Sequence, residues 1–310
     1  MPARTHARTH DSGSVEPPSP SAPHLTVAEA AQLLRISTRQ VYDGVARKGL
    51  PHLRAGGRLL FEPAALMQWL RSGGDPASSP PPPVVGGSHD PLFEWAVRES
   101  GCGLALLTAG SADGIERMAR GEVCAALVHL PSNDLQEFNR EAVMARLSGQ
   151  NVALLQWAHR EQGWMVLPGN PKGIRATQDL TRKGVRVALR QPGAGSAVLL
   201  ERLLDRAGLS TGQLRAGPRC HGEDHVAQAV RGGQADVGLG ARAAAQAAGL
   251  DFIPVIQERL DLIVHRAAWF EPALQTLWQL AQSRRLRDQA GRLGGYQLNG
   301  LGTVIWNAGP

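Results

Sequence analysis

The sequence predicts an α/β protein in two parts: a small winged helix-turn-helix domain, followed by a larger, two-lobed α/β domain. Three observations predict this. Residues 24–72 contain two short helical patterns, a glycine-tipped hairpin and a third helical pattern. Residues 73–85 are rich in proline, glycine and serine, as a linker is. Residues 86–310 alternate short apolar runs with amphipathic helical patterns, as α/β domains do.

Length and composition narrow the class of protein. The chain has 310 residues, enough for two or three domains, and 43% hydrophobic with 19% charged residues is typical of a folded soluble protein. Residues 1–23 lack the apolar segment of a signal peptide, so we expect a disordered leader. No apolar run approaches the roughly 20 residues of a membrane span. We therefore expect a cytoplasmic protein that has no membrane contact and whose three scattered cysteines are reduced.

The first domain can be read element by element. Thr26 is a predicted helix N-cap with Glu29 as its reciprocal partner, which together form a capping box. Ser37 precedes a second helix over 38–47, and Gly56-Gly57 predicts the tip of a hairpin. A third helix then closes the domain. Two helices, a wing and a closing helix make a winged helix-turn-helix.

Polar and basic side chains gather on the second helix and the hairpin, where they can reach base edges or phosphates. The predicted DNA-binding residues are Thr38, Arg39, Gln40, Tyr42, Lys48, Arg54 and Arg58. Residues 24–72 hold seven basic and three acidic residues, and so carry +4 of the formal +6 of the chain. We predict that this domain binds double-stranded DNA. The alternative is a small helical domain that binds protein and leaves its arginines in solvent.

The segment 190–196, RQPGAGS, is the strongest candidate for a ligand site in the larger domain. It follows an apolar run and leads into a helical pattern over 197–207. Ligands of open α/β lobes bind at the carboxyl ends of strands, beside helix N-termini with free amide groups. The same argument applies at the strand ends near Ser88, Ser111 and His129, and Arg160 and Arg190 could add positive charge. The full predicted set is Ser88, Asp90, Ser111, His129, Arg160, Arg190, Gly195, Ser196 and Asp236.

Each of these residues also has a structural interpretation. A serine at a helix start can simply be an N-cap, and a single histidine after a strand is often structural. Asp90 and Asp236 repel an anion, so they could instead orient Arg160 or Arg190, or bind a cationic or hydroxylated ligand. The segment 221–225, HGEDH, reads as a loop rather than a metal site.

Two resemblances go beyond the residue patterns. The segments LTVAEAA (25–31), STRQVY (37–42) and RLLF (58–61) resemble the excisionase/MerR-type DNA-binding module. The segments GSHDP (87–91), EQGWMVLPGNPKGI (161–174), RQPGAGS (190–196), ADVGLG (235–240) and GLDFIP (249–254) resemble the periplasmic-binding-protein-like domain called molybdate-binding-like. This second resemblance implies a type II binding-protein fold, with lobe 1 at about 86–156 and 256–310 and lobe 2 at about 157–255.

Together the resemblances imply a one-component transcriptional regulator that senses a small ligand, with an oxyanion such as molybdate or tungstate as a candidate. We expect ligand binding to close the lobes and a homodimer to bind two DNA half-sites. We expect no cofactor and no enzymatic activity, because the sequence has no phosphate-binding loop, nucleophile elbow or His-Glu-x-x-His pair. The alternative is an enzyme, or an oligomerisation module without a ligand, on the same two-lobed fold.

Overall fold

The computed structural model describes residues 24–47, 50–71 and 81–308. The chain divides into two compact units, Met1–Ser79 and Pro80–Pro310, which we call the head and the body. The described elements of the head are α1 (Val27–Leu34), α2 (Thr38–Arg47), β1 (Leu53–Ala55), β2 (Arg58–Leu60) and α3 (Pro63–Arg71). The head is the predicted winged helix-turn-helix.

The local signals of the head act as the sequence predicts. Thr26 and Glu29 form the capping box of α1: the Thr26 hydroxyl accepts from the Glu29 amide, and Glu29 Oε2 accepts from the Thr26 amide at 2.8 Å. Gly56 and Gly57, at the tip of the antiparallel β1–β2 hairpin, have φ angles of 55° and 78°, which glycine adopts without strain. The head has its own core, formed by Ala30, Ala31, Leu34, Val41, Leu50, Phe61 and Leu66.

The body is built on one sheet with the strand order β4-β3-β5-β10-β6-β9-β7-β8, and β11 and β12 pair with β6. Its strands are β3 (Val84–Gly87), β4 (Ala105–Thr108), β5 (Ala125–Val128), β6 (Val152–Val166), β7 (Arg186–Arg190), β8 (Arg215–Cys220), β9 (Val237–Ala241), β10 (Asp251–His265), β11 (Tyr296–Gln297) and β12 (Val304–Asn307). Its α-helices are α4 (Pro91–Ser100), α5 (Ser111–Ala119), α6 (Arg140–Leu147), α7 (Gly195–Arg206), α8 (Glu223–Arg231), α9 (Arg242–Ala247), α10 (Arg266–Trp269), α11 (Pro272–Ala281) and α12 (Arg284–Leu293).

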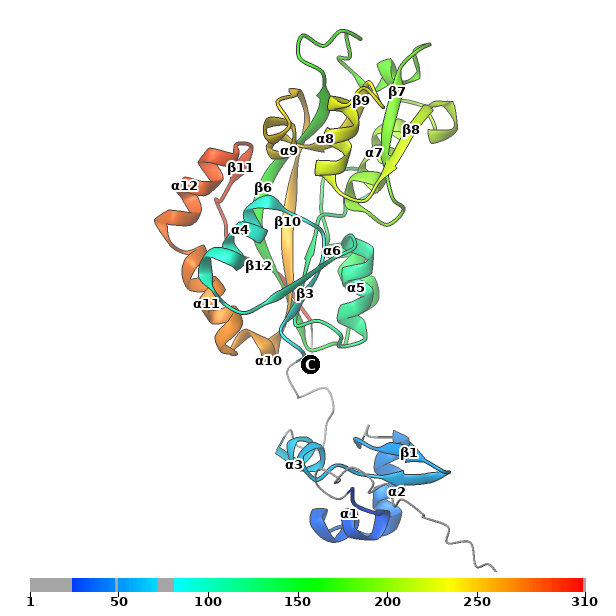
Figure 1. Ribbon diagram of the computed structural model, residues 1–310, viewed down its shortest axis with the longest axis vertical. Coiled ribbons are helices and arrows are strands. Elements are labelled where there is room, and N and C mark those ends of the chain that lie inside the picture. Colours follow the sequence, from blue (N-terminus) through cyan, green and yellow to red (C-terminus); the bar gives the residue numbers. More distant parts are fainter. Residues whose placement is uncertain (1–23, 48–49, 72–80, 309–310) are drawn as a thin grey trace, which may run out of the picture. The chain divides into compact units, whose positions relative to one another are not determined.

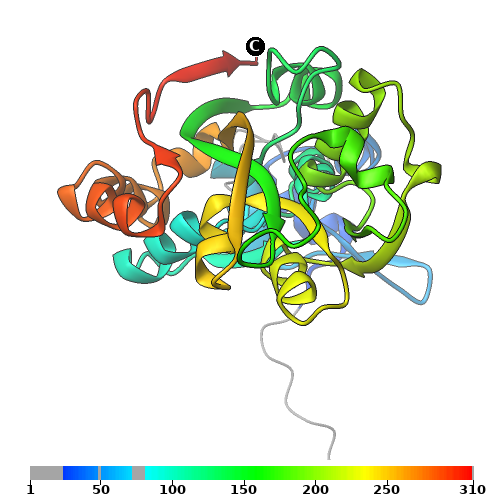
Figure 2. The same cartoon turned by 90° about the horizontal axis from the view of Figure 1, so that it is seen from above.

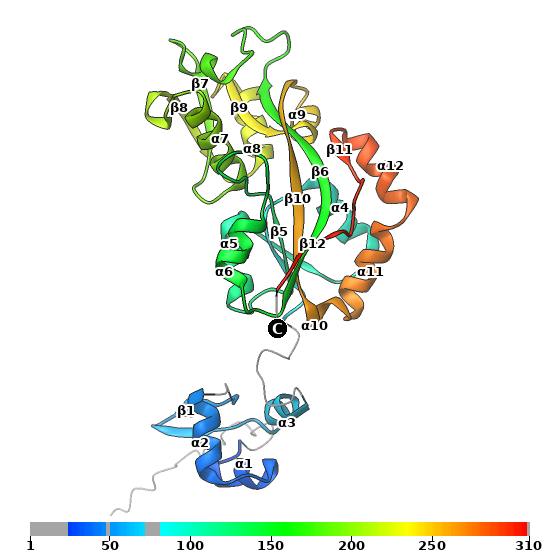
Figure 3. The same cartoon turned by 180° about the vertical axis from the view of Figure 1, so that it is seen from behind.

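Two long antiparallel strands, β6 and β10, run through the whole body (Figure 1). Strands β3, β4 and β5 are parallel to one another at one end of this pair, and β7, β8 and β9 are parallel at the other. Seen from behind, α4, α11 and α12 lie on one side of the pair and α5 and α6 on the other (Figure 3). The body therefore has two lobes joined by two shared strands.

The sequence patterns divide each shared strand into two apolar runs, at 151–156 and 163–166 and at 252–255 and 260–264, and this division is wrong. Each pair of runs is one strand of 15 residues. The segments between the runs contain Arg160, Gln162 and Glu258, which are fully buried polar residues. Their side chains interrupt the apolar pattern but not the backbone pairing, because Glu258 lies directly opposite Arg160 in the register.

Each lobe has separate hydrophobic cores. The cores of the first lobe include Ala158 on β6 and Leu260 on β10, whereas those of the second include Trp164 on β6 and, at their margin, Ile256 on β10. The crossing between lobes thus falls between Ala158 and Trp164 on one strand and between Ile256 and Leu260 on the other. This crossing is where the buried polar residues lie.

Two further differences from the predicted boundaries concern the ends of the body. The predicted linker 73–85 includes Val84 and Val85, but these begin β3, and 72–80 lies outside the described residues. The C-terminal segment, red in Figure 2, returns along β6 through β11 and β12 and adds strands that no pattern predicts. Among the described residues, none of the helices is long and apolar enough to cross a membrane.

Candidate functional site

Four helices begin at the junction of the lobes, after the strands on which the sequence places the ligand site. Asp90 is the N-cap of α4 and accepts from the Phe93 amide at 2.9 Å. Helices α5, α7 and α8 begin at Ser111, Gly195 and Glu223. Helix N-termini carry unpaired amide groups and a partial positive charge, so negatively charged groups are stabilised there.

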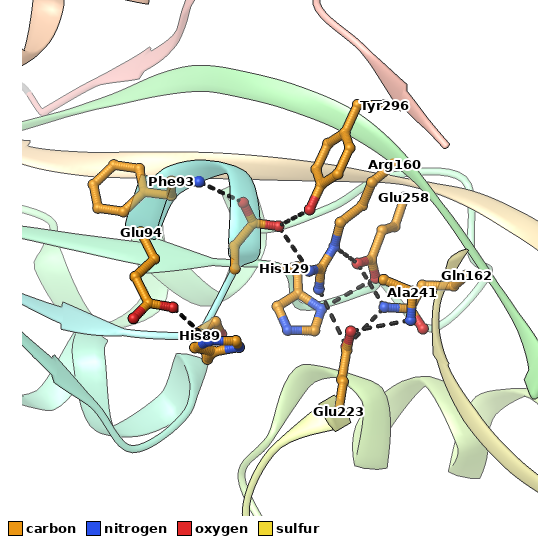
Figure 4. Close-up of polar contacts among 12 residues, drawn as sticks. His89, Phe93, Glu94, His129, Arg160, Gln162, Glu223, Ala241, Glu258 and Tyr296 are labelled. Carbon is orange, nitrogen blue, oxygen red and sulfur yellow. Dashed lines mark hydrogen bonds and ion pairs between the residues drawn. The ribbon is translucent and has the colours of Figure 1, made fainter. Parts of the chain in front are cut away.

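A buried guanidinium lies at the centre of the junction. The Arg160 residue is 1% exposed and forms ion pairs with three carboxylates. Its Nη1 is 3.1 Å from Asp90 Oδ2 and its Nη2 is 3.3 Å from Glu223 Oε1. Its Nε is 2.5 Å from Oε1 of Glu258, the residue opposite it on β10. Figure 4 shows Glu223 and Glu258 converging on this side chain from separate elements, α8 and β10.

Further groups complete this arrangement. Gln162 Nε2 donates to Glu223 at 2.8 Å and to Glu258 at 3.0 Å. The Tyr296 hydroxyl donates to Asp90 at 2.7 Å, and His129 Nδ1 lies 3.1 Å from Glu258 Oε2 (Figure 4). We call the set the Arg160 cluster, which comprises Asp90, His129, Arg160, Gln162, Glu223, Glu258 and Tyr296.

The pKa values of the cluster follow from burial opposed by pairing. Burial alone would raise the pKa of the Glu223 carboxyl, but Arg160, His129 and Arg190 lower it to about 2. The pKa of Glu258 is lowered in the same way, because attraction to Arg160 and His129 outweighs burial. Burial and the Asp90 carboxylate raise the pKa of Tyr296 well above its ordinary value. The cluster is therefore a set of charges held inside the protein by one another.

A chain of hydrogen bonds joins three predicted ligand residues. Ser88 Oγ lies 2.7 Å from Ser111 Oγ, which also accepts from the His129 amide at 3.1 Å. The alternative interpretation of the serines as N-caps is wrong, because the N-caps of α4, α5 and α7 are Asp90, Gly110 and Ala194.

Gly195 lies against His129 across the junction of the lobes. A Cβ atom at Gly195 would be 2.4 Å from the His129 carbonyl oxygen and 2.6 Å from its ring. Only glycine permits this close approach, so any side chain here would push the start of α7 away from β5.

Arg190 and Ser196 differ from the cluster in having unused hydrogen-bonding capacity. Arg190 Nε donates to Gln191 at 3.2 Å, and within the described part of the chain Arg190 forms no ion pair. Its pKa is lowered, mainly by burial, although Glu223 acts in the opposite direction. The Ser196 residue is 2% exposed, and its buried hydroxyl has no hydrogen-bond partner among the described residues. An unpaired buried hydroxyl is costly, so this one is a candidate ligand contact.

Asp236 lies apart from the other predicted ligand residues. It precedes β9, at the opposite end of the parallel strands from Ala241, whose amide donates to Glu223. Its carboxylate accepts from the backbone amide of Arg186 at 2.8 Å and from that residue's Nε at 3.2 Å. The position at the start of a strand, not at its end, excludes it from the junction.

Sequence reasoning missed Gln162, Glu223, Glu258 and Tyr296. Gln162 and Glu258 left a signal in the sequence. Gln162 follows Arg160 in a break between two apolar runs, and Glu258 lies in a second such break, so the two breaks carry opposite charges, as a buried cross-strand pair would. Glu223 stood in the segment interpreted as a loop. Tyr296 left no signal, because it reaches Asp90 from a distant part of the chain.

The predicted DNA-binding residues are on the surface of the head. Thr38, Arg39, Gln40, Tyr42, Arg54 and Arg58 are exposed, and Lys48 lies outside the described residues. Tyr42, Arg54 and Arg58 line one groove between α2 and the wing. Gln40 also stabilises its own helix, since its Oε1 accepts from the Ser37 amide at 2.9 Å.

The described residues contain no group of three or more His, Cys, Asp or Glu side chains placed to hold a metal ion. In the Arg160 cluster the carboxylates already have a positive partner at their centre.

Comparison with known proteins agrees with this architecture. The model of a helix-turn-helix domain matches residues 25–74, and the model of a PBP superfamily domain matches 94–282. YvgK of Bacillus subtilis (strain 168) is 28% identical over 307 residues, which cover 90% of this chain and 97% of that protein. A putative phosphate ABC transporter substrate-binding protein from Clostridium perfringens, solved with bound phosphate, has a TM-score of 0.51 at 10% identity. That match covers 68% of this chain and 96% of the other, and at this identity it concerns the fold alone.

The two matched domains are binding and regulatory families rather than enzyme families. The predicted fold class is confirmed, and so is the predicted combination of a helix-turn-helix with a binding-protein-like domain. The chain belongs to the PBP superfamily, and it carries a helix-turn-helix domain ahead of its two-lobed body.

Proposed function

We propose that this protein is a DNA-binding transcriptional regulator that senses a small ligand with an anionic group, bound between the lobes at Arg190 and Ser196. The observation that carries the proposal is the Ser196 hydroxyl, which is buried in the first turn of α7 without a partner. A ligand oxygen there would satisfy the hydroxyl and meet the free amides of the helix start.

The charges of the junction favour the Arg190 side for an anion. Arg160 cannot supply a free positive charge, because three carboxylates already neutralise it. Arg190 has no such partner among the described residues. Asp90 caps α4 and Glu223 is the first residue of α8, so both of these helix starts carry a carboxylate, whereas α7 has no acidic residue in its first turn.

These groups suit a compact anion, such as molybdate, tungstate or a small carboxylic acid. Charge-assisted hydrogen bonds from Arg190 and the free amides would bind the ligand. The hydroxyl of Ser196 would add orientation.

The head supports the DNA-binding half of the proposal. Among the described residues, Arg39, Arg54 and Arg58 form no ion pairs, and all three are exposed. Exposed arginines on α2 and the wing can neutralise DNA phosphates or donate to base edges. A head of this size contacts few base pairs, so a homodimer on two half-sites is the form that we propose.

A thermal-shift assay on the full chain tests the ligand site. Sodium molybdate, tungstate, sulfate, phosphate and a panel of small carboxylic acids are the probes. We expect at least one to raise the melting temperature of the body, because a ligand that binds only the folded state stabilises it. Arg190→Ala should remove the shift, whereas Arg175→Ala, which deletes an exposed arginine in the loop that follows β6, should keep it. Equal shifts in both variants would exclude Arg190 from the site.

Fluorescence anisotropy with a duplex from the region upstream of the gene tests the head. We expect Arg39→Ala to weaken binding by about tenfold and to lower the salt dependence by about one counterion. The ligand-induced shift should remain, because the two functions lie in separate units. Loss of both properties in this one variant would contradict the division of labour between head and body.

A further inference from the structure

Arg160 joins the two lobes. Asp90 caps α4, which packs with α11 and α12 in the first lobe, and Glu223 begins α8, which packs on β9 and β7 in the second. One guanidinium on the shared strand β6 pairs with both carboxylates, through Nη1 at 3.1 Å and Nη2 at 3.3 Å. Figure 4 shows Glu223 reaching Arg160 from the start of α8.

The lobes also touch through their backbones at the same junction. The amide of Ala112, in the first turn of α5, donates to the carbonyl of Gly193 at 3.2 Å. Gly195 lies against His129, as described above. The ion pairs and the backbone contacts together hold the two lobes against each other at this junction.

We propose that Arg160 is a built-in latch that holds the two lobes together. Opening the body requires the guanidinium to leave either Asp90 or Glu223. The carboxylates stand at the starts of α4 and α8, where an anionic ligand group would otherwise be stabilised. Two of the four helix starts at the junction thus carry carboxylates of the chain itself, and the start of α7, which has no acidic residue in its first turn, is left for the ligand.

The balance of charge explains why such a latch can open. Charges buried in a pair lose hydration, and much of their mutual attraction is offset by that loss. When the lobes separate, water reaches Asp90, Arg160 and Glu223 and restores their hydration. The latch therefore biases the equilibrium between open and closed forms and does not fix it, so a ligand with modest differential affinity can shift it.

This inference deepens the proposed function, on which it rests for any effect on DNA, but the latch itself is tested without ligand or DNA. Hydrogen exchange of single backbone amides in the full chain reports opening. The Ala112 amide bonds across the lobes to Gly193, while the Gly114 amide bonds to Gly110 within the first lobe. The first reports separation of the lobes and the second reports the integrity of α5.

Glu223→Gln removes one charge of the latch and keeps an acceptor for the Ala241 amide. We expect exchange at Ala112 to rise by about tenfold relative to Gly114, the factor for losing one charge-assisted hydrogen bond. Asp236→Asn is the matched control: it removes one carboxylate from the same lobe, but its partner Arg186 lies in that lobe. This control should leave the exchange at Ala112 unchanged.

Asp90→Asn tests the other half of the latch and decides the matter if Glu223→Gln does not fold. Asparagine is as good an N-cap as aspartate, so α4 should keep its start while Arg160 loses a charged partner. The same rise at Ala112 supports the latch. Unchanged exchange at Ala112 in folded protein, or an equal rise in Asp236→Asn, overturns it. Failure of every probe to bind would refute the sensing function without altering these results.

Discussion

Arg160 and Arg190 lie at the same junction and have opposite environments. Arg160 is 1% exposed and has three carboxylate partners, whereas Arg190 is partly exposed and has no ion pair within the described residues. Carboxylates raise the pKa of the first guanidinium despite burial, and burial lowers the pKa of the second. The sequence predicts that both arginines bind the same ligand, but their surroundings differ: carboxylates compensate the charge of Arg160 and, in the described part of the chain, not that of Arg190.

The difference shows that a buried arginine near a predicted binding site is not by itself an anion receptor. What counts is how much of its charge remains uncompensated. Arg160 holds the protein's own carboxylates together, while Arg190 can still bind a negative group. Variants of the two arginines and of their neighbours should therefore differ in stability and in ligand binding.

The largest expected effect is on stability. Arg160→Ala would leave Asp90, Glu223 and Glu258 buried without a positive partner and should lower the free energy of unfolding of the body by about 3–5 kcal/mol. Arg190→Ala breaks no ion pair and should change it by less than about 1 kcal/mol. Urea unfolding followed by circular dichroism measures both. Arg160→Lys keeps the charge but not the fork of donors, so it should fall between them.

Similar losses for Arg160→Ala and Arg190→Ala would show that the ion pairs of the cluster contribute little. The distinction between the two arginines would then rest on exposure alone.

The next expected effect is on the pH dependence of stability, because the pKa values of two buried carboxyl groups are shifted in opposite directions. The pKa of Glu223 is lowered to about 2, so its contribution to stability is present above its ordinary pKa of 4.5 and is lost as the pH falls toward 2. Burial raises the pKa of Asp261 to about 6 despite Arg259, so its contribution is present below pH 3.8 and is lost as the pH rises through 6.

Unfolding free energies measured from pH 3 to pH 8 should separate these carboxylates. Over this range Glu223→Gln should flatten the acid side of the curve, by on the order of 2 kcal/mol. Asp261→Asn should flatten the side between about pH 4 and pH 7. If Glu223→Gln left the acid limb unchanged, the charge of Glu223 would not be held by Arg160.

The smallest effect on stability is expected at Ser196. Its hydroxyl has no hydrogen-bond partner among the described residues, so Ser196→Ala should change the free energy of unfolding by no more than about 0.5 kcal/mol. We expect this change to be a small increase in stability rather than a decrease. The same variant should weaken the ligand-induced thermal shift. A marked loss of stability without ligand would mean that the hydroxyl has a structural partner.

The sequence determined the local structure of the protein. The capping box of Thr26 and Glu29 and the glycine pair of the wing are satisfied within a few residues, so their patterns carry the full information. The alternation of apolar runs and helices likewise predicted an α/β body, and the resemblance to a binding-protein-like domain implied its two lobes. The strand ends that bring Ser88, Ser111 and Ser196 to the junction followed from the same alternation.

Only the tertiary structure decided how charge is distributed at the junction. Arg160 meets Asp90, Glu223 and Glu258 across 70, 63 and 98 residues of sequence. No local pattern specifies these partners, because they are chosen by the pairing of β6 with β10 and by the docking of α4 and α8. The sequence thus predicted polar groups at the strand ends of the junction, and long-range packing decided which arginine has no carboxylate partner among the described residues.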